Sequence, residues 1–307
     1  MKKLGIIGIG NIAQKAYLPV YEQLRDQYEW HIVSRHEEQL NHLKQRYGFK
    51  YGHTSVEELI EERPLAVFVH TPTSSHYQIV KELLQSDINV YVDKPISENY
   101  QEVEELFQIA RDHKVLLTCG FNRRFVPVHK EMKAIGLPHR VFASKVRQNE
   151  LQEPKFAVYD LLIHVVDLVQ FELNSDKAKY VGGLITLTDD EQYLKSAEIT
   201  MQGSQGVGTA LIGMQTGVNS ESILKISNQG VLQAKDCQEL THTNAENETI
   251  TRGGDWQRLL ITRGFEPLVN EFLDAVVNKT DNPVSEKSVL SSHWLCSRLL
   301  EESKVIK

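Results

Sequence analysis

The glycine-rich turn near the N-terminus restricts the fold of this chain more than any other feature. An apolar run from Leu4 leads directly into Gly8-Ile9-Gly10-Asn11-Ile12-Ala13, which fits the pattern G-x-G-x-x-G/A. In this pattern the first glycine permits a tight turn, the second leaves room for a pyrophosphate, and the small third residue lets a helix pack on the strand. We therefore predict a strand, a phosphate-binding turn and a helix to about Asp26, with Gly8, Gly10, Asn11 and Ile12 at the cofactor. A glycine-rich turn without a ligand is the alternative.

Apolar runs and helical segments then alternate as far as residue 120. The β-prone runs lie at 30–33, 65–70, 89–92 and 115–119, and helical segments between them include 77–85 and 99–113. Repeated β-α-β units are typical of a parallel sheet with helices on both faces. The predicted fold class is α/β, with an N-terminal Rossmann domain, a doubly wound parallel sheet, in residues 1–120.

The end of the second predicted strand bears on the choice of cofactor. The strand at 30–33 is followed by Ser34-Arg35-His36. A site specific for NAD places an acidic residue here to hold the ribose 2′-hydroxyl, and this sequence has none. An arginine suits a 2′-phosphate, which it can bind with paired charge-assisted hydrogen bonds. Ser34 and Arg35 therefore favour NADP over NAD, unless Arg35 only caps the strand at the surface.

The third predicted strand ends in a polar turn. Leu65 to His70 is a continuous apolar run, as expected for a strand buried on both faces. The turn that follows contains Thr71, Pro72 and His76, which we expect to face the cofactor. In the alternative, Ser74 or Ser75 is only a helix cap and His76 is a surface residue of the first helical turn.

The strand Asn89–Val92 delivers an acid, a lysine and a proline in succession, Asp93-Lys94-Pro95. A lysine at the carboxyl end of a strand in a doubly wound sheet points to the crevice where ligands bind. Pro95 restricts the backbone on either side of the bond, so Lys94 is aimed rather than mobile. Asp93 is expected to hold the turn by accepting backbone hydrogen bonds. A solvated lysine in a surface turn is the alternative.

Beyond residue 120 the pattern changes. One helix at about 126–135 and a strand at about 140–147 are followed by β-prone runs at 180–188, 197–201, 207–214, 222–227 and 230–234. Short polar turns between them predict a mostly antiparallel open sheet, within a second, α+β domain at 121–307. The polar stretch Thr241–Glu248 is predicted to be a loop. Two helices, about 265–278 and 285–303, close the chain, with packing back on the first domain as an alternative to packing on the second.

A helix-length stretch from Ala157 to Val169 is apolar almost all round and should be buried. After Tyr159 its polar residues are Asp160, His164 and Asp167, at i, i+4 and i+7, which places them on one face. Buried ionisable groups are costly unless they have a polar partner. This stripe of polar residues on one face predicts the wall of an active site, or an internal Asp–His pair that only supports the core.

Composition and charge exclude several classes of partner and cellular location. The chain has 307 residues and a net charge of −7, without a long basic run, which disfavours nucleic acid and anionic membranes as partners. No apolar stretch is long enough to span a bilayer, and the N-terminus has no signal-peptide pattern. Three scattered cysteines, Cys119, Cys237 and Cys296, are typical of a reducing cytoplasm. The 12 histidines show no metal-binding motif, so no metal site is predicted.

Together these motifs resemble the Gfo/Idh/MocA family of NAD(P)-dependent oxidoreductases, and within it the MviM-type oxidoreductases. The matches are the glycine turn, Asp93-Lys94-Pro95 where most members have Glu-Lys-Pro, the junction Gly120-Phe121-Asn122-Arg123-Arg124-Phe125, and the D-x-x-x-H helix with Asp160 and His164. The glycines that usually precede this aspartate are replaced by Phe156-Ala157-Val158-Tyr159, which implies a differently shaped entrance to the substrate pocket.

The resemblance implies hydride transfer between the nicotinamide of NADP or NAD and a secondary alcohol or ketone of a sugar, polyol or related small molecule. It implies catalytic roles for Lys94, His164 and Asp160, a cofactor contact for Asn122, and a homodimer or higher homo-oligomer formed through the second domain. A family resemblance does not identify the substrate. Two rival functions are an NADP-binding redox sensor without turnover and a glycosidase-like enzyme that uses NAD as an internal redox aid.

Overall fold

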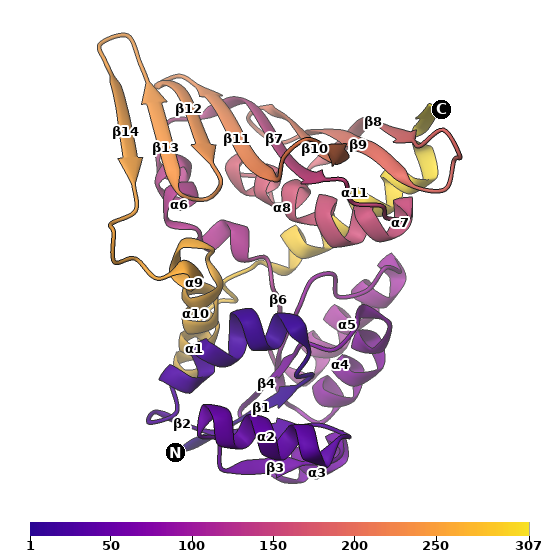
Figure 1. Ribbon diagram of the computed structural model, residues 1–307, viewed down its shortest axis with the longest axis vertical. Coiled ribbons are helices and arrows are strands. Elements are labelled where there is room, and N and C mark those ends of the chain that lie inside the picture. The colour runs from indigo at the N-terminus through magenta and orange to yellow at the C-terminus, as the bar shows by residue number, and fades with distance from the viewer. Residues whose placement is uncertain (307) are drawn as a thin grey trace. The chain divides into compact units, whose positions relative to one another are not determined.

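The computed structural model describes residues 1–306 and divides into two compact units. The first unit comprises Met1–Gly120 and Phe265–Glu286, and the second comprises Phe121–Gly264 and the chain from Lys287 onward. Each unit is built around its own sheet, and Figure 1 labels the elements of both. Within residues 1–306, no helix is long and apolar enough to cross a membrane.

A six-stranded parallel sheet forms the centre of the first unit, in the order β3-β2-β1-β4-β5-β6. Its strands are β1 (Lys2–Ile7), β2 (Tyr28–Val33), β3 (Tyr51–His53), β4 (Ala66–Val69), β5 (Asn89–Val92) and β6 (Leu117–Cys119). This order is that of the doubly wound dinucleotide-binding fold, which confirms the predicted Rossmann sheet. Ligands of such sheets bind beyond the carboxyl ends of the strands, at the point between β1 and β4 where the order reverses.

Helices cover both faces of this sheet, since every residue of β4 is fully buried although its side chains alternate between the faces. Helix α1 contacts α2, and α4 contacts α5. The helical elements are η1 (Ala13–Tyr17), α1 (Leu18–Gln23), α2 (Glu37–Tyr47), α3 (Val56–Glu61), η2 (Thr73–Ser75), α4 (His76–Gln85) and α5 (Tyr100–His113). Ser55 caps α3, where its Oγ accepts a hydrogen bond from the Glu58 amide (3.2 Å).

Helix α10 (Phe265–Asn278) belongs to the first unit although it lies far along the chain. Two edge-on aromatic contacts anchor it. The ring of Phe265 lies 5.3 Å from that of Tyr17, and the ring of Phe272 lies 5.4 Å from that of Phe68. Such pairs stabilise by about 0.5–1.5 kcal/mol beyond the area that they bury.

A nine-stranded sheet forms the second unit, in the order β14-β13-β12-β11-β7-β10-β9-β8-β15. Only the β7–β10 and β8–β15 pairs are parallel, so the prediction of a mostly antiparallel sheet is confirmed. The strands are β7 (Pro138–Gln148), β8 (Lys179–Leu187), β9 (Leu194–Gln202), β10 (Val207–Thr216), β11 (Ser220–Ser227), β12 (Gly230–Lys235), β13 (Glu239–Thr243), β14 (Glu248–Arg252) and β15 (Lys304–Ile306).

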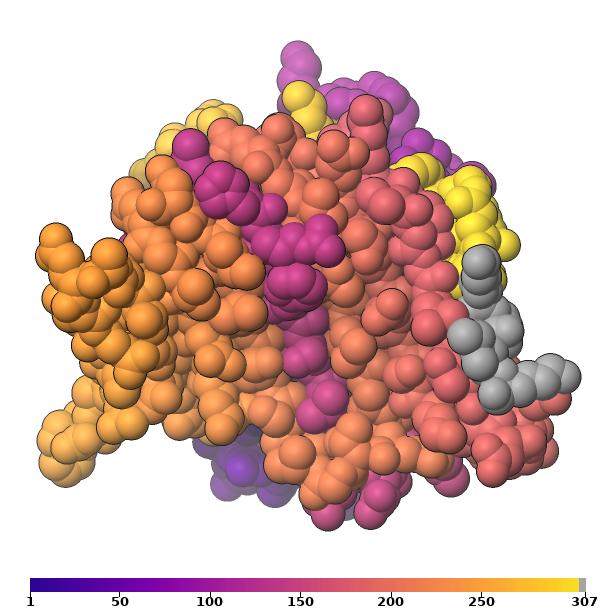
Figure 2. Space-filling model, turned by 90° about the horizontal axis from the view of Figure 1, so that it is seen from above, coloured from indigo at the N-terminus to yellow at the C-terminus, as the bar shows by residue number. Residues whose placement is uncertain are grey.

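The helices of the second unit pack on one face of its sheet. Helix α8 contacts β7 and β10, and α6 contacts β12 and β13. Figure 2 shows the other face, where the strands themselves form the surface. The elements are η3 (Asn122–Phe125), α6 (Pro127–Ala134), α7 (Pro154–Ala157), η4 (Val158–Leu162), α8 (Ile163–Glu172), α9 (Leu259–Thr262) and α11 (Glu286–Glu302).

The predicted loop Thr241–Glu248 is wrong, because β13 and β14 form an antiparallel hairpin there. The turn is held by Asn244 Oδ1, which accepts hydrogen bonds from the amides of Glu246 (2.9 Å) and Asn247 (3.0 Å). Most of β14 is exposed, so its residues lack the apolar alternation by which a half-buried strand is recognised.

Candidate active site

The fingerprint turn has the geometry that a dinucleotide requires. Gly8 has a φ of 90°, and a Cβ at this position would lie 2.5 Å from the backbone of His70 and Thr71. No other residue fits there. At Gly10, in contrast, a Cβ would meet nothing within 4 Å, so the space above the turn is open. The helical segment behind it begins with the π-helical turn η1, which no side chain caps.

A cavity of about 530 Å³ lies over this turn in the first unit. It is lined by most of the residues that the sequence assigned to the cofactor, namely Gly8, Gly10, Ser34, Arg35, Thr71 and Pro72. Asn11 and Ile12 are exposed on the same turn, and Ile12 is 45% exposed. Three neighbouring strand ends, those of β1, β2 and β4, therefore contribute to one cavity at the reversal of strand order.

The β2 end supplies two different groups to the cavity. Ser34 is nearly buried, and its hydroxyl accepts a hydrogen bond from the amide of His36 (3.2 Å), so it shapes the turn. Arg35 is exposed and lines the cavity, which leaves its guanidinium accessible to an anion. Glu57, whose charge is opposite to that of Arg35, lines the same cavity from the first turn of α3.

The β4 end separates the roles of Thr71 and His76. Within residues 1–306 the Thr71 hydroxyl oxygen is buried and has no hydrogen-bond partner, so it is placed to bond a ligand in the cavity. His76 is buried, and its ring nitrogens lie 2.7 Å from the Thr71 carbonyl and 2.9 Å from the Pro95 carbonyl. Burial lowers the pKa of His76, against the two carbonyls, which favour the protonated ring. His76 therefore ties the turn after β4 to the turn after β5 and does not face the cavity as expected.

Lys94 is half-buried at the carboxyl end of β5, and its bond to Pro95 is cis. The preceding Asp93 accepts a hydrogen bond from the Tyr17 hydroxyl (2.5 Å) and lies 3.0 Å from Nδ1 of His70. Burial alone would raise the pKa of Asp93, but the charge and hydrogen bond of His70 and the bond from Tyr17 hold it below its usual value. An ionised carboxylate thus anchors the segment that carries the lysine.

In the second unit, α7, η4 and α8 form the helical stretch that carries the D-x-x-x-H motif. From Ala157 to Gln170 every residue is buried except Asp160 and His164, which are half-exposed. Asp160 lies in the π-helical turn η4, closed by a bond from the Ile163 amide to the Val158 carbonyl. Single π-helical turns occur frequently at functional sites. Over residues 157–170, the only partly exposed side chains are therefore the two to which the sequence assigned catalytic roles.

The third polar residue of the stripe has a structural role. Asp167 is buried and forms a two-bond ion pair with Arg124, at 2.8 and 2.5 Å. The neighbouring Arg123 pairs in the same way with Glu221, at 2.5 and 2.9 Å. Asn122 is also buried, and its amide donates to the Arg263 carbonyl (2.8 Å). The junction motif thus supplies the internal polar frame of the second unit.

Comparison with known proteins places this architecture in a family. Residues 2–121 match the family model GFO_IDH_MocA, described as an oxidoreductase family with an NAD-binding Rossmann fold. YceM of Salmonella typhimurium, which is described only as an oxidoreductase, is 30% identical over 296 residues, 94% of each chain. The chain belongs to the Gfo/Idh/MocA family of oxidoreductases.

Solved structures extend the likeness to both units of this Gfo/Idh/MocA oxidoreductase. The dehydrogenase MviM of Clostridium difficile is 26% identical, with a TM-score of 0.91 over 98% of this chain and 99% of that one. A Gfo/Idh/MocA family oxidoreductase of Vibrio cholerae is 25% identical, with a TM-score of 0.89 over 98% and 97%. The protein is therefore an NAD(P)-dependent oxidoreductase.

The residues present fit the NAD(P) cofactor of a Gfo/Idh/MocA oxidoreductase. Gly8 admits no side chain, and Gly10 leaves open space for the pyrophosphate. The Thr71 hydroxyl lines the same cavity and can form a hydrogen bond with the cofactor. Sequence reasoning missed one part of this site, the start of α3 with Thr54, Ser55 and Glu57. Ser55-Val56-Glu57-Glu58 has the pattern of a helix start, but only the pairing of β3 with β2 brings it to the cavity.

Proposed function

We propose that this oxidoreductase transfers a hydride between NADP(H) and a secondary alcohol or ketone of a sugar, polyol or related small molecule. The bound nicotinamide supplies the hydride chemistry. Lys94 hydrogen-bonds the reacting oxygen of the substrate and favours its anionic form. His164 takes up or returns the hydroxyl proton as general acid and base, and Asp160 orients the substrate or the imidazole.

The observation that carries this proposal is the pattern of exposure along the helix of the second unit. A helix buried over fourteen residues, except at one acid and one histidine four positions apart, leaves these two ionisable side chains partly exposed. A helix that only supported a core would bury these two positions as well, or would replace them with apolar residues. The third ionisable residue, Asp167, shows this structural use, since it is buried against Arg124.

The choice of NADP rests on the β2 end. Arg35 lines the cavity, no acid directly follows the strand, and Ser34 can accept or donate a hydrogen bond without repelling a phosphate. Arg35 would pair with the 2′-phosphate, and Thr71 would bond the cofactor from the β4 end. Glu57 opposes this preference from α3, which makes the preference a balance of two charges.

We also propose that the enzyme is a homodimer or higher homo-oligomer formed through the outer face of the second sheet. Along β7 and β11 the buried side chains alternate with outward ones that include Phe142 and Ile226, which are 39% and 38% exposed. The strands of this face form a continuous surface in Figure 2. An uncovered face of this kind, with apolar side chains, fits a second copy of the chain.

A cytoplasmic location is proposed from the cysteines. Cys119, Cys237 and Cys296 are buried and free, and burial raises the pKa of the Cys237 thiol to about 11. Thiols kept reduced are typical of a reducing compartment. Cell fractionation would test the location, and recovery outside the cytoplasm would contradict it.

A substrate panel tests the proposed activity. Sugars, inositols and keto-sugars would be supplied with NADP or NADPH, and turnover would be followed by the absorbance of NADPH. We expect stoichiometric cofactor conversion with at least one polyol or keto-sugar. Binding of NADPH without conversion by any member of the panel would contradict the proposed substrate class. Product formation without net change in NADPH would indicate a glycosidase-like reaction instead.

A further inference from the structure

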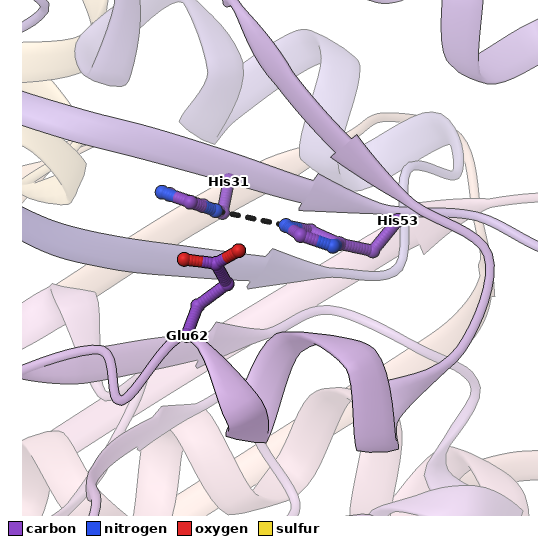
Figure 3. Close-up of side chains that lie close together, drawn as sticks. All are labelled: His31, His53 and Glu62. Atoms are coloured by element: carbon purple, nitrogen blue, oxygen red, sulfur yellow. Dashed lines mark hydrogen bonds between the residues drawn. The ribbon is translucent and has the colours of Figure 1, made fainter.

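Two histidines meet at the edge of the first sheet, and neither of them lines the cavity. His31 lies on β2 and His53 on the neighbouring β3. Their rings are stacked with centroids 5.1 Å apart and planes 7° from parallel, and Nδ1 of His31 lies 2.8 Å from Nε2 of His53 (Figure 3). A ring nitrogen of each residue therefore points at the other.

Carboxylates flank this pair on both sides. Glu62, just after α3, directs its carboxylate at the two rings, and one potential ligand atom from each of the three residues lies within 4.8 Å of the others (Figure 3). On the far side of His31, Nε2 lies 3.0 Å from Oε1 of Glu29. An Nε2–H that donates to Glu29 leaves the lone pair of Nδ1 directed at His53 and Glu62. Metal-binding histidines almost always donate their other N–H to a carboxylate or carbonyl in this way.

The ligand atoms of the cluster suit a cation. The carboxylate of Glu62 and one ring nitrogen each of His31 and His53 converge on a small volume at the sheet edge. Glu29 lies outside this volume, at the other ring nitrogen of His31.

Lys3 is the present counter-ion of Glu62, with Nζ 2.6 Å from Oε2. The two side chains are 38% and 37% exposed. Solvent screens an exposed pair of this kind and leaves it weak, so a divalent cation can displace the lysine, which is free to extend into water.

We propose that His31 Nδ1, His53 Nε2 and the Glu62 carboxylate form a site for Zn²⁺ or a similar divalent transition metal. Glu29 would orient His31 from behind. Imidazole and carboxylate ligands suit zinc, which takes three protein ligands and a water in open tetrahedral sites. Zn–N bonds of about 2.0–2.1 Å at a tetrahedral angle separate two nitrogens by about 3.3 Å. The two rings therefore need to move apart by roughly 0.5 Å, within the reach of side-chain adjustment.

Such a site would stabilise the side of the cofactor cavity that β2 and β3 form. The amide of Ser34 donates to the carbonyl of His53 (3.1 Å), and Ser34 lines the cavity, as do Thr54 and Ser55 beside His53. A metal that holds β2 to β3 at His31 and His53 would stiffen the side of the cavity that carries Arg35. This role is additional to the proposed reaction and does not depend on its substrate.

The competing interpretation is a hydrogen-bonded histidine pair that only closes the sheet edge. The two interpretations differ in metal affinity and in the effect of Lys3. A metal site gains affinity when Lys3 no longer competes for Glu62, whereas a histidine pair without a metal is indifferent to it.

Metal titration of the full chain tests the proposal. Protein freed of metal by a chelator would be titrated with Zn²⁺ by calorimetry and with Co²⁺ by visible absorption, which reports tetrahedral coordination. We expect one metal per chain. His31→Gln and His53→Gln should each weaken binding at least about tenfold, and Glu29→Gln about 10- to 100-fold, the range for partners that orient a ligand. Lys3→Gln should strengthen it.

His113→Gln is the matched control, because His113 pairs with Asp87 (2.8 Å) in the same unit. Its metal affinity should equal that of the wild type, and NADPH binding should report the fold of every variant. Absence of saturable one-to-one binding would overturn the proposal, and so would equal affinity of wild type and both histidine variants. If the histidine variants fail to fold, Glu29→Gln and Lys3→Gln decide: changes in the two expected directions support the site, and no change in either overturns it.

Discussion

The carboxylate of Asp93 lies 3.0 Å from Nδ1 of His70, and both side chains are shielded from water at the neighbouring carboxyl ends of β5 and β4, beside Lys94. His70 in turn lies 2.8 Å from the Tyr21 hydroxyl, and Asp93 accepts from Tyr17. A network of buried hydrogen bonds thus links η1 and α1, which follow the glycine turn, to the segment that carries Lys94.

Asp93→Asn should destabilise the protein by about 1–3 kcal/mol, because it leaves buried partners poorly matched. Urea unfolding would measure the loss. Asp87→Asn is the control, since Asp87 also pairs with a histidine but its side chain is 76% exposed. This variant should stay within about 0.5 kcal/mol of the wild type. Equal losses in the two variants would show that the Asp93 network adds nothing through burial.

The same pair determines a dependence on pH. The pKa of Asp93 is lower in the folded protein than its ordinary value of about 3.9. Its contribution to stability is therefore fully present above about pH 4 and is lost as the pH falls through the folded pKa. Acid titration of the unfolding free energy should show a larger drop below pH 4 in the wild type than in Asp93→Asn.

The cofactor preference is the second prediction. A hydrogen bond to a charged group contributes about 1.5–3 kcal/mol, so NADPH should bind at least about tenfold more tightly than NADH. Arg35→Ala should remove most of this preference, and Ser34→Asp should invert it. Isothermal titration of both cofactors would measure the affinities. Equal affinities in the wild type, or tighter NADH, would contradict the assignment of the β2 end.

Glu57 gives the third prediction. It lines the cavity that also holds Arg35, and its pKa is lowered by backbone and Ser55 hydrogen bonds, so it is anionic. Glu57→Gln should therefore strengthen NADPH binding more than NADH binding, by a few-fold, because only NADPH carries the extra phosphate. Glu61→Gln, on the same short helix but outside the cavity lining, is the control. A loss of NADPH affinity in Glu57→Gln would mean that the carboxylate binds the ribose instead.

The sequence was sufficient for five of the six strands of the first sheet and for the glycine turn and strand ends of its cavity, because these depend on local signals. The short edge strand β3 was not predicted. The glycine spacing, the apolar run of β4 and the lysine after β5 each lie within a few residues. Residues brought together by strand pairing were not predictable. His31 meets His53, and Glu57 lines the same cavity as Arg35, only because β2 pairs with β3, and no motif records that register.

Two other features escaped the sequence for physical reasons. The hairpin of β13 and β14 is polar on most of β14, so it lacks the alternation that identifies half-buried strands. The π-helical turns η1 and η4 add one residue to a helical turn without a compositional signal. The substrate is also beyond prediction, since a family fold hosts many substrates.

The fourth prediction concerns assembly. Light scattering at micromolar concentration should show a dimer or a higher homo-oligomer. Phe142→Asp should shift the equilibrium towards the monomer, because it places a charge in the centre of the outer face of the sheet. Leu151→Asp, at an exposed position outside the strands, should leave the mass unchanged. A monomeric wild type at high micromolar concentration would contradict the proposed interface.

The last prediction tests the chemistry at His164. General acid–base catalysis is typically worth about 10²- to 10⁴-fold in rate, so His164→Asn should lower kcat on the identified substrate by that factor. Its affinity for NADPH should be unchanged, because the cofactor cavity belongs to the first unit. His242→Asn removes a partly exposed histidine of the same unit that bonds only to the Gln229 carbonyl among its described contacts, and it should retain full activity. The dependence of kcat on pH separates catalysis from support of the fold, because the wild-type profile should show one ionisation that is absent from the profile of His164→Asn. A folded His164→Asn with wild-type turnover and an unaltered pH profile would remove this histidine from the proposed role and leave Lys94 as the remaining candidate.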